Sequence, residues 1–209
     1  MSIESFVKNN VREPVRQRII DACNNDQAAT CVILACAWLR NHPDDLYVIH
    51  CYAEMLYQMT RYEEAVLVYQ DAIERFPDHR WGIWNQLGHL YRYRGDLEQA
   101  AAWYQLAVVE NPDDATSYIF LGAVQARQGH LELAEQTFRR ATKCLEGCVD
   151  EAYHNLGLVL RGQGRLMEAK ECFEQALVID DDYHEAVDAL RDVITAIEIE
   201  SSRESDGSQ

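Results

Sequence analysis

The sequence predicts an all-α protein, a solenoid built from antiparallel helix pairs. Two observations carry this prediction. Several classes of residue recur together at intervals of 34 or 35 residues. Each interval also divides into two amphipathic segments, with a glycine at the turn between them in most copies. A period of this length with two helices per unit is typical of a repeat architecture.

Small and aromatic residues mark the repeat. Leu-Gly pairs begin at Leu87, Leu121 and Leu156. Three further series all step by 35, 34 and 35 residues, and independent positions that share such irregular steps are not a chance pattern. These series are Ala65, Ala100, Ala134 and Ala169; Ala72, Ala107, Ala141 and Ala176; and, between them, Tyr69, Tyr104, Phe138 and Phe173.

The interval 81–114 indicates how one unit folds. Gly95 ends the first helix, because glycine tolerates the left-handed turn there, and Asp96 can cap the second helix. Pro112 stops the second helix. The small residues lie where the two helices cross closely, and an aromatic ring fills the space beside them. The inner faces comprise Trp84, Leu87, Gly88 and Tyr91 on the first helix and Ala100, Tyr104 and Ala107 on the second.

At these residues the sequence resembles the tetratricopeptide repeat. The resemblance covers four units, at 46–80, 81–114, 115–149 and 150–183. It implies a right-handed superhelix in which the first helix of each pair lines a concave surface, and a protein that binds other proteins without catalysing a reaction. The unit at 46–80 departs most from the pattern, with Tyr52-Ala53 in place of Leu-Gly and Thr60 in place of the turn glycine.

The two ends differ from the central repeats. We expect residues 1–45 to form N-terminal helices, as a degenerate first repeat or a cap. The segment Ala28 to Leu39 is apolar nearly all round, which indicates burial on several sides or a contact with a partner, and we favour the buried cap. Residues 184–200 are predicted to form a C-terminal capping helix, and residues 201–209 a disordered tail.

Composition excludes several classes of partner and compartment. The formal net charge of −16 is spread through the repeats, so we expect no binding to nucleic acid or to anionic membranes. Seven cysteines, an odd number, indicate reduced thiols and not a disulfide framework. The N-terminus lacks the apolar stretch of a signal peptide, and no apolar run approaches the roughly 20 residues that span a bilayer. We therefore expect a cytoplasmic protein.

The candidate binding residues project from the first helices. The core stripe uses positions 4, 7, 8 and 11 of the repeat, so positions 2, 5, 9, 12 and 13 face the predicted groove. The second pair of helices contributes His50, Glu54 and Tyr57, and the third contributes Asn85, His89, Arg92 and Tyr93. The fourth contributes Thr116, Ile119, Ala123 and Arg127, and the fifth contributes Glu151, His154, Leu158 and Arg161.

Three of these residues suggest the chemistry of a ligand. Arg92, Arg127 and Arg161 occupy equivalent or adjacent places in successive repeats and predict a basic stripe that grips an acidic peptide segment. The alternative is that they neutralise helix dipoles and nearby acids. Some relatives clamp chaperone tails with Lys and Asn at set groove positions. Only Asn155 is reminiscent of that clamp, so we disfavour this role.

No catalytic or metal-binding pattern emerges. Cys144 and Cys148 form the only close cysteine pair, with Cys172 and His184 as remote further candidates, and we interpret them as ordinary thiols. No histidine and carboxylate spacing matches a known catalytic motif, and we expect no enzyme activity, cofactor or metal. Two alternatives to a peptide-binding scaffold stay open. One is a homo-oligomer assembled through the apolar N-terminal helices, and the other is an accessory domain of an enzyme.

Overall fold

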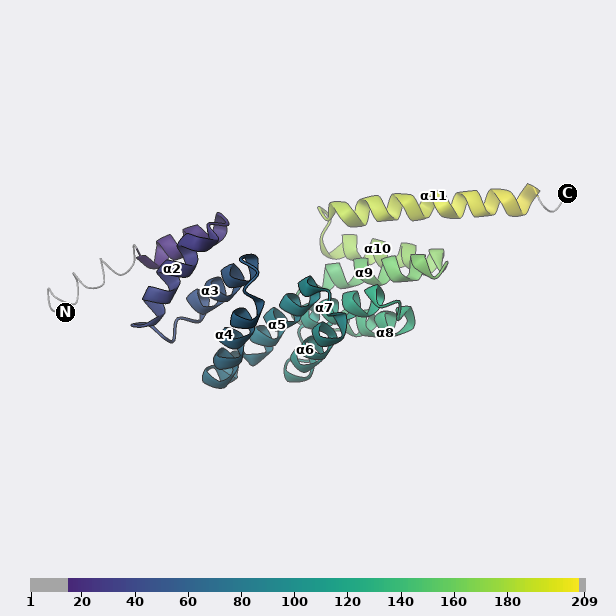
Figure 1. Cartoon of the computed structure of the whole chain (residues 1–209). Helices are drawn as coiled ribbons and strands as arrows, with labels where there is room; N and C mark the ends of the chain where they lie inside the picture. The colour runs from purple at the N-terminus through teal and green to yellow at the C-terminus, as the bar shows by residue number, and fades with distance from the viewer. Residues whose placement is uncertain (1–14, 207–209) are drawn as a thin grey trace. The chain divides into compact units, whose positions relative to one another are not determined.

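The computed structural model describes residues 15–206, which form helices joined by short turns (Figure 1). The predicted all-α class is therefore confirmed. The chain divides into two compact units, the first up to residue 90 and the second from residue 91. The boundary falls within helix α5 (Arg80–Arg94). Residues 1–14, where the sequence predicts the start of an N-terminal cap, lie outside the described residues.

In the first unit, helices that follow one another in sequence pack side by side. Residues 15–24 are helical, α2 packs against α3, and α3 packs against α4. A short 3₁₀ turn, η1, leads from α4 into α5. The core contains Ile19, Cys31, Ala35, Val48, Ala53, Leu56, Ala65 and Tyr69. The element bounds are α2 (Ala28–Leu39), α3 (Leu46–Gln58), α4 (Tyr62–Arg75) and η1 (Pro77–His79).

The second unit continues the same pattern. Each helix from α6 to α11 packs against the next, and α7 also contacts α9, so first helices of neighbouring pairs touch. Contacts limited to neighbours are the signature of a solenoid. The bounds are α6 (Leu97–Glu110), α7 (Ala115–Arg127), α8 (Leu131–Ala141), α9 (Val149–Gly162), α10 (Leu166–Ile179) and α11 (His184–Asp206).

Two helix pairs of the second unit cross where a glycine faces an aromatic ring. A methyl group on Gly122 would lie 2.7 Å from Cε1 of Phe138, and one on Gly157 would lie 2.6 Å from Cε1 of Phe173. Phe138 and Phe173 are 2% and 0% exposed, so neither ring has room to move aside. The recurring glycine and aromatic positions in the sequence therefore report the closest approach of the two helices.

The turns follow the residues that the sequence places there. Gly95, Gly129 and Gly164 adopt positive φ angles of 77–84°, and Thr60 takes the same left-handed region with φ 60°. Asp96 caps α6 by accepting a hydrogen bond from the Gln99 amide at 3.1 Å, as predicted.

The turn between α8 and α9 carries Glu146 where the preceding repeats have Pro77 and Pro112. The Ala115 amide donates to the Glu146 carbonyl at 2.9 Å, and the Glu146 amide donates to the Asp113 carbonyl at 3.1 Å. The turn is thus fixed by pairing with the preceding inter-repeat turn.

Both ends differ in part from the expectations. Helix α2 buries one face, through Cys31, Val32 and Ala35. Ile33 is 69% exposed, so the helix is not buried on several sides as the sequence predicts. Helix α11 extends to Asp206, six residues past the predicted end at 200. Ser201 and Ser202 donate hydroxyl hydrogen bonds to the carbonyls four residues earlier, as serine commonly does within a helix. Residues 207–209 lie outside the described part of the chain.

The close crossing at Gly157 makes a testable prediction. Gly157→Ala should lower the free energy of unfolding by about 1–2 kcal/mol, because overpacking against Phe173 outweighs the gain in helix propensity. Gly162→Ala is the matched control, since it lies in the same helix beside open space and should leave stability equal or raise it by up to about 1 kcal/mol. Urea unfolding followed by circular dichroism measures both. Equal effects of the two substitutions would contradict the close crossing.

Candidate functional site

The candidate residues of the first unit centre on His50 in α3. Its Nδ1 atom lies 2.9 Å from the Tyr69 hydroxyl of α4, and its Nε2 atom lies 3.7 Å from Glu54 Oε2 on the next turn of α3. The Cys23 thiol, at the end of the first described helix, donates to the same Glu54 oxygen at 3.6 Å. His50 therefore sits in a polar chain that joins three helices, with one edge toward solvent.

A pocket of about 200 Å³ opens beside His50. Its walls are mostly apolar and come from α3, α4 and the start of α5, including Ile49, Tyr69, Trp81 and Ile83. The imidazole of His50 adds a polar group to this lining. A few polar groups set in an apolar hollow are the usual arrangement of a recognition site, in which apolar contacts supply affinity and polar groups fix orientation.

The other candidates of the first unit differ in accessibility. Tyr57 is half-buried, with its ring 5.2 Å from that of Tyr62. His89 is also half-buried. Asn85 was expected to face the groove but is only 4% exposed, so it is a buried polar residue of α5. The repeat position alone did not reveal this, because burial depends on the side chains around it.

Ile119 is the clearest departure in the second unit. The sequence places it in the groove, but it is 2% exposed and belongs to a core cluster with Tyr104, Ala115 and Ala152. The contact of α7 with α9 accounts for this burial, because it brings the next first helix over the position. Leu158 is half-buried and packs against the neighbouring cluster around Phe173. These two residues therefore stabilise the stack.

The three arginines have three different environments. The Arg92 guanidinium carbon lies 5.0 Å from the centre of the Tyr93 ring, a cation–π arrangement, and Tyr93 is 63% exposed. Arg127 is exposed at the end of α7. Arg161 lies 3.7 Å from Asp192 of α11, so part of its charge is already compensated. They do not form a stripe of equivalent side chains.

His154 occupies the same repeat position as His50 and has a similar partner. Its Nδ1 atom lies 3.2 Å from the Tyr183 hydroxyl, and its ring centre lies 5.7 Å from that of Phe173. Tyr183 belongs to the turn before α11, and burial raises its pKa to about 12. Nothing in the repeat pattern indicated this residue, because it lies at the end of the last repeat.

The remaining predicted positions surround these residues. Thr116, Ala123 and Glu151 are half-buried on α7 and α9. Burial raises the pKa of the Glu151 carboxyl. Within residues 15–206, no three His, Cys, Asp or Glu side chains are grouped so that they could hold a metal ion, and Cys144 and Cys148 are free thiols. No described helix is both long enough and apolar enough to span a membrane.

Known proteins share these repeats. Family models described as "TPR repeat" and "Tetratricopeptide repeat" match residues 88–129, and residues 52–79 and 150–183, respectively. Human tetratricopeptide repeat protein 7A is 33% identical over 128 residues, which is 61% of this chain but 15% of that protein. The Protein CTR9 homolog of Arabidopsis thaliana is 25% identical over 122 residues, or 58% of this chain and 11% of that protein. The chain thus matches only a small part of these relatives.

Solved structures show the same fold. A thermophilic tetratricopeptide repeat protein from Thermus thermophilus, TTC0263, has a TM-score of 0.63 at 19% identity, covering 88% of this chain and 99% of that one. The first such domain of Spaghetti (RPAP3), bound to an HSP90 peptide, has a TM-score of 0.53 at 20% identity, covering 57% and 94%. Residues 52–79, 88–129 and 150–183 thus match tetratricopeptide repeat models, and the chain has the fold of solved tetratricopeptide repeat proteins.

Proposed function

We propose that the chain is a non-enzymatic scaffold that binds a segment of another protein along the outward faces of its first helices. The pocket beside His50 carries this proposal, because it combines apolar walls with a polar edge in the helix position that a solenoid presents to partners. The solved domain of RPAP3, a relative in fold, holds an HSP90 peptide, which supports a peptide as the kind of ligand.

For the second unit we expect a ligand that carries carboxylates. Arg127 is exposed, and arginine binds a carboxylate through two parallel hydrogen bonds. Arg161 instead fits the alternative that these arginines neutralise nearby acids, since Asp192 already pairs with it. The acidic character of the ligand therefore depends mainly on Arg127 and on Arg92.

Self-association is the second candidate function, and Ile33 is the observation that favours it. This residue is 69% exposed on a helix without any charged side chain. Against it stands the net charge of −16, because two copies repel one another at low salt. Light scattering of the full chain and of Ile33→Asp decides between the two. A dimer that the substitution dissociates would favour self-association.

Phage-displayed random peptides selected on the full chain test the scaffold function. We expect enriched peptides that carry Asp or Glu, with affinities that fall about fivefold in Arg127→Ala, because one charge-assisted contact is worth about 1 kcal/mol. Arg191→Ala, on the exposed face of α11 and paired with Asp188, is the matched control and should leave the affinity unchanged. Enriched peptides without carboxylates, or equal affinities for both variants, would contradict an acidic ligand at Arg127.

The two groove histidines also affect stability. Burial lowers the pKa of His50, although Glu54 acts in the opposite direction, and burial likewise lowers the pKa of His154. A histidine with a lowered pKa binds its proton less readily in the folded state than in the unfolded state. As the pH falls below the ordinary value of about 6.5, the unfolded chain therefore gains protons first, and folding becomes less favourable.

We therefore expect the free energy of unfolding to fall less steeply between pH 7.5 and pH 5 in the double variant His50→Gln, His154→Gln than in the parent chain. Glu151 has the opposite sign, because its raised pKa favours the folded state as the pH falls, so the difference between variant and parent is the measured quantity. His184→Gln, on an exposed histidine at the start of α11, serves as the control. Identical pH profiles for parent and double variant would show that burial of these rings does not affect stability.

A further inference from the structure

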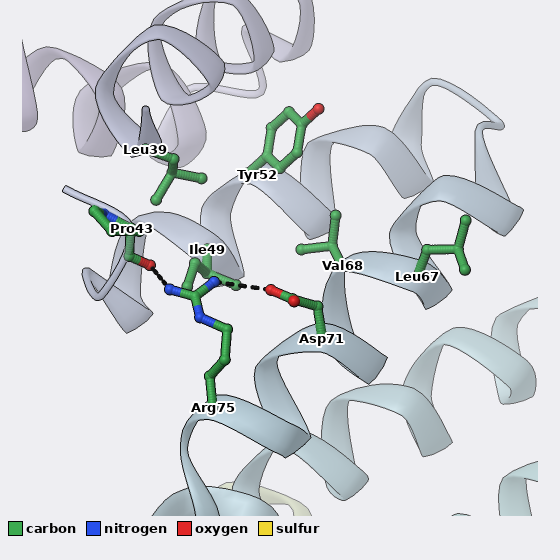
Figure 2. A pocket seen from close by; sticks show the side chains of 8 residues that line it. All are labelled: Leu39, Pro43, Ile49, Tyr52, Leu67, Val68, Asp71 and Arg75. Carbon is green, nitrogen blue, oxygen red and sulfur yellow. Dashed lines mark hydrogen bonds and ion pairs between the residues drawn. The ribbon is translucent and has the colours of Figure 1, made fainter. Parts of the chain in front are cut away.

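A second pocket of the first unit lies among α2, α3 and α4, on the side of the second helices (Figure 2). Its volume is about 300 Å³. Leu39, Ile49, Tyr52 and Val68 form apolar walls, and Leu67 stands at one end. This space can take one large aliphatic or aromatic side chain.

The fold alone does not require an apolar lining here. The second unit has a pocket at the same place in its repeat, between α6, α7 and α8. There Gln136 and Thr137 stand where the first unit has Leu67 and Val68. Leu67 is nevertheless 62% exposed, so it contributes little to the core. The exposed Leu67 side chain extends the apolar surface of the hollow.

Arg75 holds the other end of the pocket in place. Its guanidinium donates to the Pro43 carbonyl and to Asp71 Oδ2 at 2.8 Å (Figure 2). It also donates to Asp44 Oδ1 at 3.0 Å, and these bonds join α4 to the turn before α3. Both of its terminal nitrogens are therefore engaged within the protein. Asp44 and Asp71 are 83% and 62% exposed in their side chains, so their carboxylates still reach solvent. The rim of the pocket can accept hydrogen bonds from a cation.

The charge of α4 also favours a cationic ligand. The helix contains four acidic residues, Glu63, Glu64, Asp71 and Glu74, and one basic residue, Arg75. A second copy of this chain would bring another −16 charges to this surface, whereas a basic segment would neutralise it. We propose that the pocket docks a basic peptide segment, in which Lys or Arg flanks one large apolar side chain that fills the hollow. This pocket shares only the buried Ile49 with the pocket beside His50, and its ligand has the opposite charge to the one proposed for the second unit.

Three capped pentapeptides test the proposal by NMR titration of the ¹⁵N-labelled full chain. They are Gly-Lys-Phe-Lys-Gly, its acidic counterpart with Glu in place of Lys, and its counterpart with Ala in place of Phe. The Lys-Phe-Lys peptide should give saturable shifts at the amides of the pocket. We expect binding at least about tenfold weaker without the Phe ring, because burying such a side chain is worth about 1.5–3 kcal/mol. The acidic peptide should also bind more weakly, most clearly at low salt.

Leu67→Asp and Gln136→Asp form a matched pair of variants, since both sites are exposed and share one repeat position. Leu67→Asp should weaken the Lys-Phe-Lys peptide about tenfold, and Gln136→Asp should not change its affinity. Equal binding of basic and acidic peptides, shifts confined to other residues, or unchanged affinity in Leu67→Asp would each overturn the proposal. Concentration-dependent shifts of the pocket amides without any peptide would also overturn it, in favour of a second copy of the chain.

Discussion

The close approach of the two helices in the pairs α7–α8 and α9–α10 is the constraint on which the rest of the second unit depends. Glycine faces a buried ring at Gly122–Phe138 and at Gly157–Phe173, where a single methyl group would lie within 2.7 Å of the ring. This contact fixes how the second helix lies on the first. The opposite face of the first helix is then left to the next repeat and to ligands. The proposed binding surface and the core are thus two sides of one helix.

The repeat was predictable from sequence because the crossing demands particular residue sizes at fixed spacing. The glycine and aromatic series, the Asp96 cap and the turn glycines all have local causes. Accessibility was less predictable. Ile119 is buried because α9 packs against α7, and Arg161 is paired because Asp192 comes from the terminal helix. The burial of Ile119 and the pairing of Arg161 both depend on neighbouring helices, which a position within one repeat does not specify.

The two pockets of the first unit differ in how far the repeat pattern predicts them. The repeat position of His50 predicts that it faces a ligand, and the structure has a pocket beside it. The pocket beside Leu67 is not predictable from the sequence, because one apolar residue at a usually polar position carries little signal. Comparison with Gln136, at the same place in the second unit, makes the difference visible. The two proposals therefore give one chain two ligands of opposite charge, a basic segment beside Leu67 and an acidic segment at Arg127.

A double-mutant cycle at Gly157 and Phe173 tests the central constraint most directly. Replacing Phe173 by Leu removes ring atoms from the position that a methyl group at residue 157 would occupy. The account predicts a favourable coupling of roughly 0.5–3 kcal/mol, so that the double variant is more stable than the sum of the single effects implies. Strictly additive free energies of unfolding would contradict it, because they would mean that the glycine and the ring do not meet.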